Sequence, residues 1–162
     1  GGCAALAVNI LFSLIGFTGS SEVYEQVAEK QFALPLWAGI ILYGIVSPIA
    51  EEIVFRGIVY NRMHSQYVKW IAIIGSALLF GLYHGIIVQA LYGFMLGLLI
   101  AVLYEKYASF AVPVIIHSAA NVFVYVVTSV TGVADMVMTW PVMLICILLS
   151  GGLLGACLRK TE

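Results

Sequence analysis

The chain has 162 residues, of which 63% are hydrophobic and 9% are charged, and its net charge is −1. Soluble domains average roughly 45–50% apolar and about 25% charged residues. A soluble domain of this length cannot bury so much apolar surface, so the composition excludes soluble and disordered proteins and indicates a polytopic membrane protein. The small net charge also supplies no basic field, so we expect no nucleic-acid partner.

Six apolar segments are candidates for membrane-spanning helices, each of which needs about 20 mostly apolar residues. They are Cys3–Phe17, Leu34–Arg62, Trp70–Val88, Leu91–Tyr104, Ala111–Thr128 and Thr139–Leu158. Backbone polar groups in lipid must pair with one another, so we expect an all-α bundle of about six transmembrane helices. This bundle forms a single transmembrane domain over residues 1–162, and no feature indicates its oligomeric state.

The basic residues favour one orientation of this bundle. With a cytoplasmic N-terminus, five of them fall on the cytoplasmic side: Arg62, Lys69, Lys106, Arg159 and Lys160. This is the positive-inside pattern, so we expect an integral protein of the bacterial cell membrane with both termini in the cytoplasm. Residues 21–32 carry three glutamates and Lys30, which predicts either an amphipathic helix on the outer surface or a polar loop.

Several smaller signals complete the outline of the chain. No basic segment precedes the first apolar run, so we expect no signal peptide, and the missing initial Met indicates a fragment of a longer chain. The three cysteines lie far apart, without disulfide or metal spacing. Two Gly-x-x-x-Gly patterns, at residues 93–97 and 151–155, are typical of closely packed membrane helices.

Three charged residues lie inside the second apolar segment: Glu51, Glu52 and Arg56. Each charge at the centre of a membrane helix costs on the order of 2.5–3.5 kcal/mol, so the cluster indicates a functional site, with a structural ion pair as the alternative. Glu52 and Arg56 are four residues apart and are expected to pair. Glu51 points about 100° away around the helix axis, which favours it as a general base. Pro48 removes a backbone hydrogen bond just upstream.

Two histidines lie inside other apolar segments. Phe80 precedes His84 by four residues, and Asn121 follows His117 by four, so each pair shares one helix face. Counted at ~1.5 Å per residue from the boundary charges, Glu51 and both histidines lie roughly 16–22 Å inward. We therefore expect these groups to converge on an intramembrane polar cavity, and we expect the cavity to open towards the cytoplasmic side.

These residues form three motifs in chain order: Glu-Glu-x-x-x-Arg at residues 51–56, Phe-x-x-x-His at 80–84 and His-x-x-x-Asn at 117–121. The ordered set resembles the CAAX prenyl protease and bacteriocin-processing (CPBP or Abi) family of intramembrane endopeptidases. The resemblance covers a protease-like core of about residues 34–128. It implies hydrolysis of a peptide bond in a membrane-associated peptide or protein, by a compact bundle that looks more like the bacterial members than the eukaryotic ones.

The resemblance also implies a role for each motif residue. Glu51 and His84 would activate a water molecule, while His117 and Asn121 would stabilise the oxyanion. Glu52, Arg56 and Phe80 would support them.

A zinc-dependent version of the same protease is an alternative. Glu51, His84 and His117 have the composition of a catalytic zinc site with an open position for water. His-Glu-x-x-His is absent from the sequence. We favour the reading without a metal, because three ligands would leave Glu52 as the base, and Glu52 already faces Arg56.

Two functions of other classes also fit a membrane bundle. A bacteriocin-immunity protein would act by binding a toxin or its receptor, and would not need Glu51, His84 and His117 together. A proton-coupled transporter also uses intramembrane Glu and His, but six short spans without an inverted repeat argue against it.

Overall fold

The computed structural model describes residues 1–19, 21–130 and 132–159, and these residues form helices joined by short turns. In chain order the helices are α1 (Gly2–Leu14), α2 (Glu22–Phe32), α3 (Leu36–Gly39), η1 (Ile40–Val46), α4 (Ser47–Glu52), η2 (Ile53–Tyr60), α5 (Asn61–His64), α6 (Lys69–Tyr83), α7 (Ile87–Tyr107), α8 (Ala111–Ser129), α9 (Val133–Val137) and α10 (Trp140–Arg159). The expected all-α class is confirmed.

The segments from α3 to α5 form one continuous helix, Leu36–His64, of 29 residues. Two stretches of it, η1 and η2, are π-helical, and they flank the α-helical turn that carries Glu51 and Glu52. Single π-turns inside α-helices occur often at functional sites. The two glutamates of the charged cluster therefore lie near the middle of the longest helix, between two irregular stretches, and Arg56 lies in the second of these stretches.

Each of the six predicted apolar segments corresponds to a helix, but their lengths differ from the expectation. Among the described residues, four helices are long and apolar enough to cross a membrane: Leu36–His64, Ile87–Tyr107, Ala111–Ser129 and Trp140–Arg159. Helices α1 and α6 are apolar but shorter. The chain is thus a helical membrane protein with four candidate spans.

Helix α6 ends earlier than the sequence analysis expected. Its last residue is Tyr83, and His84 forms the C-terminal cap instead of lying deep inside a span. The reason is Gly85, whose φ of +71° belongs to the left-handed region that ends helices. The expected span Trp70–Val88 is therefore wrong at its C-terminal end.

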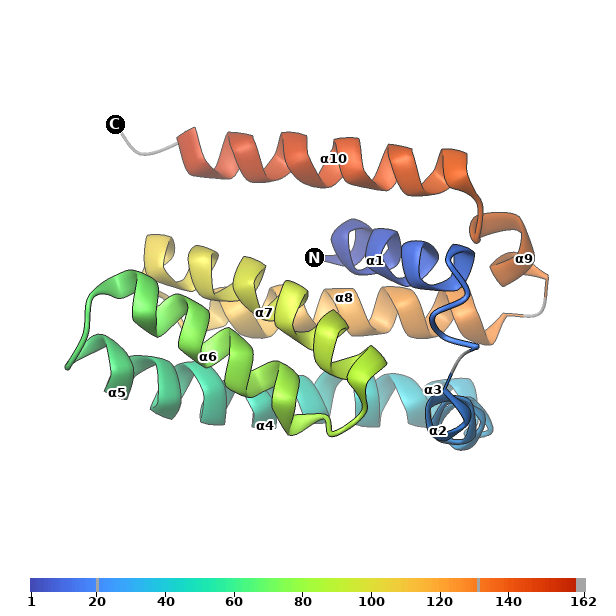
Figure 1. Ribbon diagram of the computed structural model, residues 1–162, viewed down its shortest axis with the longest axis horizontal. Helices are drawn as coiled ribbons and strands as arrows, with labels where there is room; N and C mark the ends of the chain where they lie inside the picture. Colours follow the sequence, from blue (N-terminus) through green and yellow to red (C-terminus); the bar gives the residue numbers. More distant parts are fainter. Residues whose placement is uncertain (20, 131, 160–162) are drawn as a thin grey trace.

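The helices pack around α7 and α8. Helix α6 packs closely along α7, the long helix packs against α8, and α1 lies between α8 and α10 at the edge of the bundle (Figure 1). The Gly-x-x-x-Gly pattern of α7 explains the close approach, because a Cβ on Gly97 would lie 3.3 Å from the Ala77 Cα of α6. The second pattern, in α10, has no neighbours within 4 Å of its ideal Cβ positions.

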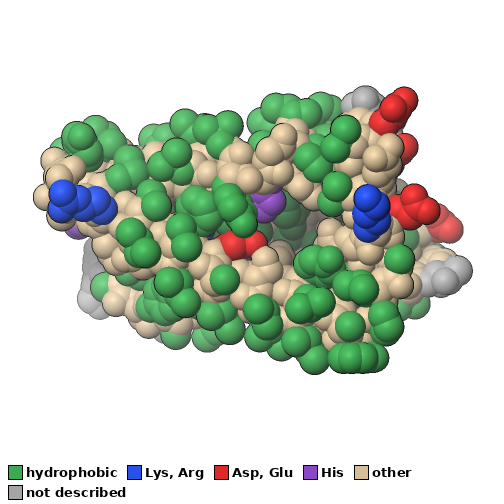
Figure 2. Space-filling view, turned by 90° about the horizontal axis from the view of Figure 1, so that it is seen from below, with side chains coloured by type: hydrophobic (Ala, Val, Ile, Leu, Met, Phe, Trp, Pro, Cys, Tyr) green, Lys and Arg blue, Asp and Glu red, His purple; other side chains and the backbone are tan. Residues whose placement is uncertain are grey.

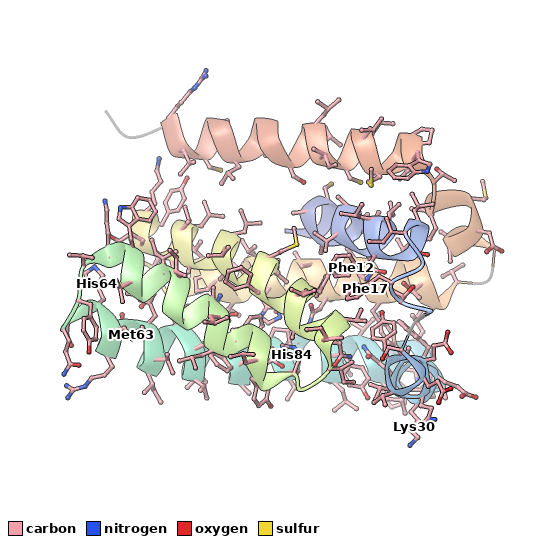
Figure 3. All side chains as sticks on the ribbon, viewed as in Figure 1. Phe12, Phe17, Lys30, Met63, His64 and His84 are labelled. Carbon is pink, nitrogen blue, oxygen red and sulfur yellow. The ribbon has the colours of Figure 1, made fainter. Side chains whose placement is uncertain are left out.

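Charge separates the two ends of the bundle. His64 lies at one end and Lys30 at the other, with His84 between them (Figure 3). The end with His64 also carries Arg62 and Lys69, whereas the glutamates of α2 lie at the end with Lys30. A broad hydrophobic face connects the two ends (Figure 2). Of the two forms predicted for residues 21–32, the structure has the helix: α2 is amphipathic, and its N-terminus is capped by Ser21.

Gly81 provides a test of the contact between α6 and α7. A Cβ at this position would lie 2.5 Å from the Ala90 carbonyl oxygen, which belongs to backbone and cannot turn away. We expect Gly81→Ala to lower the free energy of unfolding by about 1–3 kcal/mol through overpacking. Thermal unfolding in detergent measures the change. Gly151→Ala in α10 is the matched control and should not lower the midpoint. Equal midpoints for the two variants would contradict this packing.

Candidate active site

The core of the site is a buried ion pair on the long helix. Arg56 Nη1 donates to Glu52 Oε1 at 3.1 Å, and both side chains are fully buried. Arg56 Nη2 donates to the Gly97 carbonyl at 2.8 Å, which ties the long helix to α7. The predicted pairing of Glu52 with Arg56 is confirmed. Because desolvated charges are stable only when they are paired and hydrogen-bonded, this geometry stabilises both groups.

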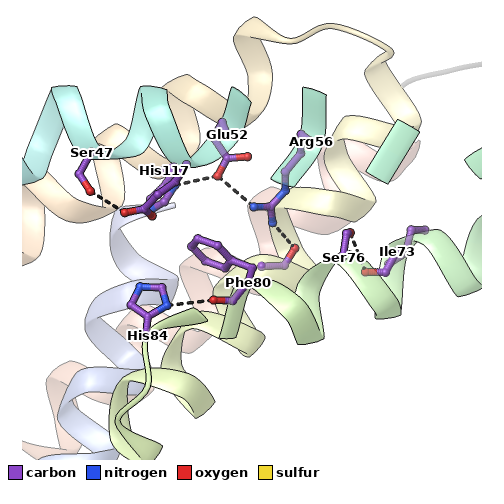
Figure 4. A network of polar contacts seen from close by, with 10 residues as sticks. Ser47, Glu52, Arg56, Ile73, Ser76, Phe80, His84 and His117 are labelled. Atoms are coloured by element: carbon purple, nitrogen blue, oxygen red, sulfur yellow. Dashed lines mark hydrogen bonds and ion pairs between the residues drawn. The ribbon is translucent and has the colours of Figure 1, made fainter. Parts of the chain in front are cut away.

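His117, on α8, extends this pair into a network (Figure 4). Its Nδ1 lies 2.7 Å from Glu52 Oε1, and its Nε2 lies 3.7 Å from Glu51 Oε2. A carboxylate accepts hydrogen bonds, so Nδ1 carries the proton in the bond to Glu52. His117 therefore faces Glu52 with one nitrogen and Glu51 with the other.

Glu51 differs from Glu52 in its environment. Its side chain is 15% exposed, whereas that of Glu52 is 0% exposed. The Ser47 hydroxyl, one turn earlier, donates to Glu51 Oε1. The other oxygen faces His117 and the pocket. The two adjacent glutamates thus point to different surroundings, as the helix geometry predicts.

Phe80 lies in contact with both histidines. Its ring is edge-to-face with His84 at 5.1 Å and with His117 at 5.4 Å between centroids. The Arg56 guanidinium lies over the same ring, 4.9 Å from its centre. His84 Nδ1 donates to the Phe80 carbonyl at 2.9 Å, which leaves Nε2 as the free nitrogen of a neutral ring.

Asn121, one turn after His117 on α8, forms a hydrogen bond with the irregular part of the long helix. Its Nδ2 donates to the Tyr43 carbonyl at 2.9 Å. The Ser47 N–H at the end of η1 bonds to the Leu42 carbonyl, five residues back. In this register the Tyr43 carbonyl would pair with residue 48, which is a proline and has no N–H. Asn121 supplies the donor that Pro48 lacks.

A pocket of about 250 Å³ brings the predicted residues together. Its lining includes Glu51, Phe80, His84, His117 and Asn121. Four of the five come from the predicted catalytic set, and Glu52 and Arg56 lie buried behind them.

The far wall of the pocket comes from segments that the motifs do not contain. This wall is lined by residues of three helices and one turn: Asn9 and Phe12 of α1, Thr18, Tyr24, Ala28, Gln31 and Phe32 of α2, and Gln89 and Tyr92 of α7. The pocket therefore extends from the motif residues towards α2, at the end opposite the basic residues. The predicted opening of the cavity towards the side with the basic residues stays a prediction. Local sequence patterns could not reveal this wall, because it depends on how α1 and α2 pack.

The donor set of the zinc alternative does not converge. Within residues 1–19, 21–130 and 132–159, no group of three His, Cys, Asp or Glu side chains has an arrangement that could hold a metal ion. Phe80 contacts both imidazoles, and His84 Nδ1 is engaged with a backbone carbonyl. Glu51, His84 and His117 thus do not fit a metal ion in this arrangement.

The comparison with protein families agrees with this geometry. Residues 33–123, more than half of the chain, match the family described as "Type II CAAX prenyl endopeptidase Rce1-like". The chain belongs to this family. The matched region begins before the long helix and ends after Asn121, so it contains all three motifs and confirms the resemblance seen in the sequence.

Curated relatives of this family member are bacterial. "Putative membrane peptidase YdiL" of Bacillus subtilis (strain 168) is 30% identical over 75% of this chain and 49% of its own length. "UPF0177 protein YxdF" of Lactococcus lactis subsp. lactis (strain IL1403) is 29% identical over 73% of this chain and 62% of its own. The chain thus spans about half to three-fifths of these relatives. No solved structure matches it.

The buried pair gives a first prediction. Arg56→Ala would remove the guanidinium from the buried Glu52 and leave this carboxylate with His117 alone, so we expect a loss of about 3–5 kcal/mol in unfolding free energy. The double variant Glu52→Gln, Arg56→Met should be more stable than Arg56→Ala, since glutamine keeps an oxygen for His117. Arg62→Ala, at an exposed position of the same helix, is the control. If Arg56→Ala unfolds at the wild-type temperature, the pair does not stabilise the bundle.

The bond from Asn121 to Tyr43 gives a second prediction. Asn121→Ala leaves a part-buried carbonyl unpaired and should cost about 1–3 kcal/mol of stability. In a Pro48→Ala background the restored N–H can bond to Tyr43, so the same substitution should cost less. A double-mutant cycle of thermal unfolding measures the coupling between the two sites. If the effects of Asn121→Ala and Pro48→Ala on stability are strictly additive, Pro48 is not the reason that the Tyr43 carbonyl needs Asn121.

Proposed function

We propose that this chain contains the catalytic core of an intramembrane endopeptidase, which hydrolyses a peptide bond of a membrane-associated peptide or protein. The observation that carries the proposal is the pocket, in which Glu51 faces the same space as two histidines and an asparagine. Family membership supports the reaction class. Glu51 lies near the middle of the 29-residue helix, which supports a site within the membrane.

In this proposal Glu51 is the general base. One of its oxygens accepts from Ser47, and the other faces the pocket, where it can take a proton from water. The hydroxide then attacks the carbonyl carbon of the scissile bond. His84 offers its free Nε2 to the same water, since Nδ1 is held by the Phe80 carbonyl. Glu51 later returns the proton to the leaving amine, so the base acts in both steps.

His117 and Asn121 stabilise the oxyanion in this scheme. Because His117 Nδ1 already donates to Glu52, a donor at Nε2 requires the imidazolium form. That form balances the local charges, since two carboxylates then face one imidazolium and one guanidinium. Asn121 uses one amide hydrogen for Tyr43 and keeps the second for the substrate. Donors fixed in a low-dielectric pocket stabilise a developing charge more than water does.

The distances support roles for Glu51 and His117 at neighbouring positions, because Glu51 Oε2 lies 3.7 Å from His117 Nε2. His84 approaches the same pocket from the end of α6.

The test is a cleavage assay on purified protein in detergent or nanodiscs. Glu51→Gln should stay folded and lose at least about 10²-fold in turnover, the low end for general-base catalysis. Asp135→Asn, an exposed acid on α9, should keep wild-type turnover. A chelator should have little effect, and elemental analysis of active protein should find no stoichiometric metal.

Two results would count against this mechanism. Near-normal turnover by folded Glu51→Gln would remove Glu51 from the chemistry. One zinc per chain, with activity lost on its removal and restored on its return, would replace the base by a metal site. An immunity protein that acts by binding alone would show no cleavage with any variant, but would still protect cells when Glu51 is substituted.

A further inference from the structure

The walls of the pocket are helical, and residues 1–19, 21–130 and 132–159 contain no β-strand. A peptide bond that is to be hydrolysed must leave any helix, and each unwound residue then presents a free N–H and a free C=O. Such groups need partners wherever little water is present. Many peptide-binding sites offer the edge of a sheet for this purpose. In helical walls most backbone groups are already paired, so the partners have to come mainly from side chains.

Two amides in the wall are free for this task. Asn9 of α1 and Gln89 of α7 both line the pocket, and both residues are half-buried. Neither side chain forms a hydrogen bond with another residue of the described part of the chain. Their amide atoms are accessible, unlike the enclosed unpaired atoms of Glu52 and Arg56. A carboxamide carries two donor hydrogens and an acceptor oxygen, so each of these side chains can pair with both the N–H and the C=O of an extended residue.

Asn9 lies in the middle of an apolar helix. Ile10 beside it is fully buried, and Ala5, one turn earlier, belongs to a buried cluster with Leu96 and Ala120. Asn9 therefore lies on the face of α1 that packs against α7 and α8. Asparagine is unfavourable inside a helix, because its side chain competes for nearby backbone groups. The pocket is the polar space that this side chain lines, so a ligand there is the partner that the amide can bind.

Gln89 lies close to the reactive side of the pocket. It is one helical turn before Gly93, and a Cβ on Gly93 would lie 3.3 Å from two atoms of the His84 ring. Residues one turn apart have Cβ atoms about 5–6 Å apart, so the Gln89 amide can bind substrate groups next to those that His84 contacts. Gln89 is the third residue of α7, where a glutamine can cap the helix, but it forms no such bond within the described residues.

We propose that Asn9 and Gln89 bind the backbone of the substrate, in place of the strand edge that the described residues lack. This inference rests on the proposed peptidase function and names the ligand of a second part of the same pocket, an extended peptide segment next to the scissile bond. The catalytic set acts on the scissile carbonyl, while the two amides hold backbone groups of the flanking residues. Because amides are neutral and bind the backbone, this subsite accepts many sequences.

Two apolar substitutions of similar shape, Asn9→Leu and Gln89→Met, test the inference on the purified protein in nanodiscs. The probe is an internally quenched peptide, chosen as the fastest-cleaved sequence of a randomised apolar set. We expect each variant to raise KM at least about threefold with kcat nearly unchanged, because the lost hydrogen bond is made equally in the ground and transition states. Gln26→Met, at an exposed position of α2 outside the pocket lining, is the matched control and should keep the wild-type KM.

Thermal unfolding separates substrate binding from a structural role of the two amides. Replacing a polar group that lacks a protein partner by an apolar one does not remove a stabilising contact, so both variants should unfold at or above the wild-type midpoint. A structural hydrogen bond predicts the opposite result, a lower midpoint together with a lower kcat.

Ester substitution in the peptide identifies the backbone as the ligand. Replacing one amide at a time by an ester, outside the scissile bond, removes a single N–H from the substrate. We expect at least one ester position to raise the wild-type KM about threefold. At that position the ester should cause no further loss in Gln89→Met or in Asn9→Leu, because the variant has already lost the same hydrogen bond.

The outcomes distinguish this inference from the proposed function. A wild-type KM in both variants, lowered unfolding midpoints, or fully additive effects of ester and substitution would overturn the inference and leave the peptidase assignment intact. A folded wild-type protein that cleaves no peptide of the randomised set would refute the peptidase function, and the inference would fail with it.

Discussion

The cost of burying charge in an apolar bundle governs the rest of this structure. Glu52 and Arg56 are fully buried, and such charges are tolerated only when they are paired with an opposite charge and hydrogen-bonded. Glu52 is one turn from Arg56, but the other partners come from distant helices: the Gly97 carbonyl of α7 and His117 of α8. The buried pair therefore requires α7 and α8 to lie against the long helix. The position of the pocket follows, because His117 holds Glu51 and Glu52 on opposite sides of one ring.

Backbone irregularity has a similar role in the site. The π-helical turns and Pro48 interrupt the regular hydrogen bonding of the long helix, and in a membrane such freed groups need partners from neighbouring helices. Asn121 is that partner for Tyr43. This hydrogen bond thus gives the Tyr43 carbonyl a partner and orients the Asn121 amide towards the pocket. At the other side of the pocket, the left-handed Gly85 ends α6 and leaves His84 at the helix terminus.

The walls of the pocket divide into two parts with different chemistry. The motif residues form the reactive side, buried against the ion pair. Residues of α1 and α2, together with Gln89 and Tyr92 of α7, form the other side, whose polar groups are amides and phenols. The family match covers residues 33–123 and so excludes α1 and α2. In our proposal the reaction therefore depends on the family motifs, while part of the wall around the substrate comes from outside them.

The sequence by itself determined the features that follow from local geometry. Apolar segment length predicted the helices, and the four-residue spacing of Glu52 and Arg56 predicted their pair, because residues one helical turn apart are neighbours in any helix. Only the tertiary structure decided which distant groups complete the site. His117 lies 65 residues from Glu52, and Asn121 lies 78 residues from Tyr43. The contact of His117 with both glutamates and the wall supplied by α1 and α2 depend on how helices pack, which no local periodicity encodes.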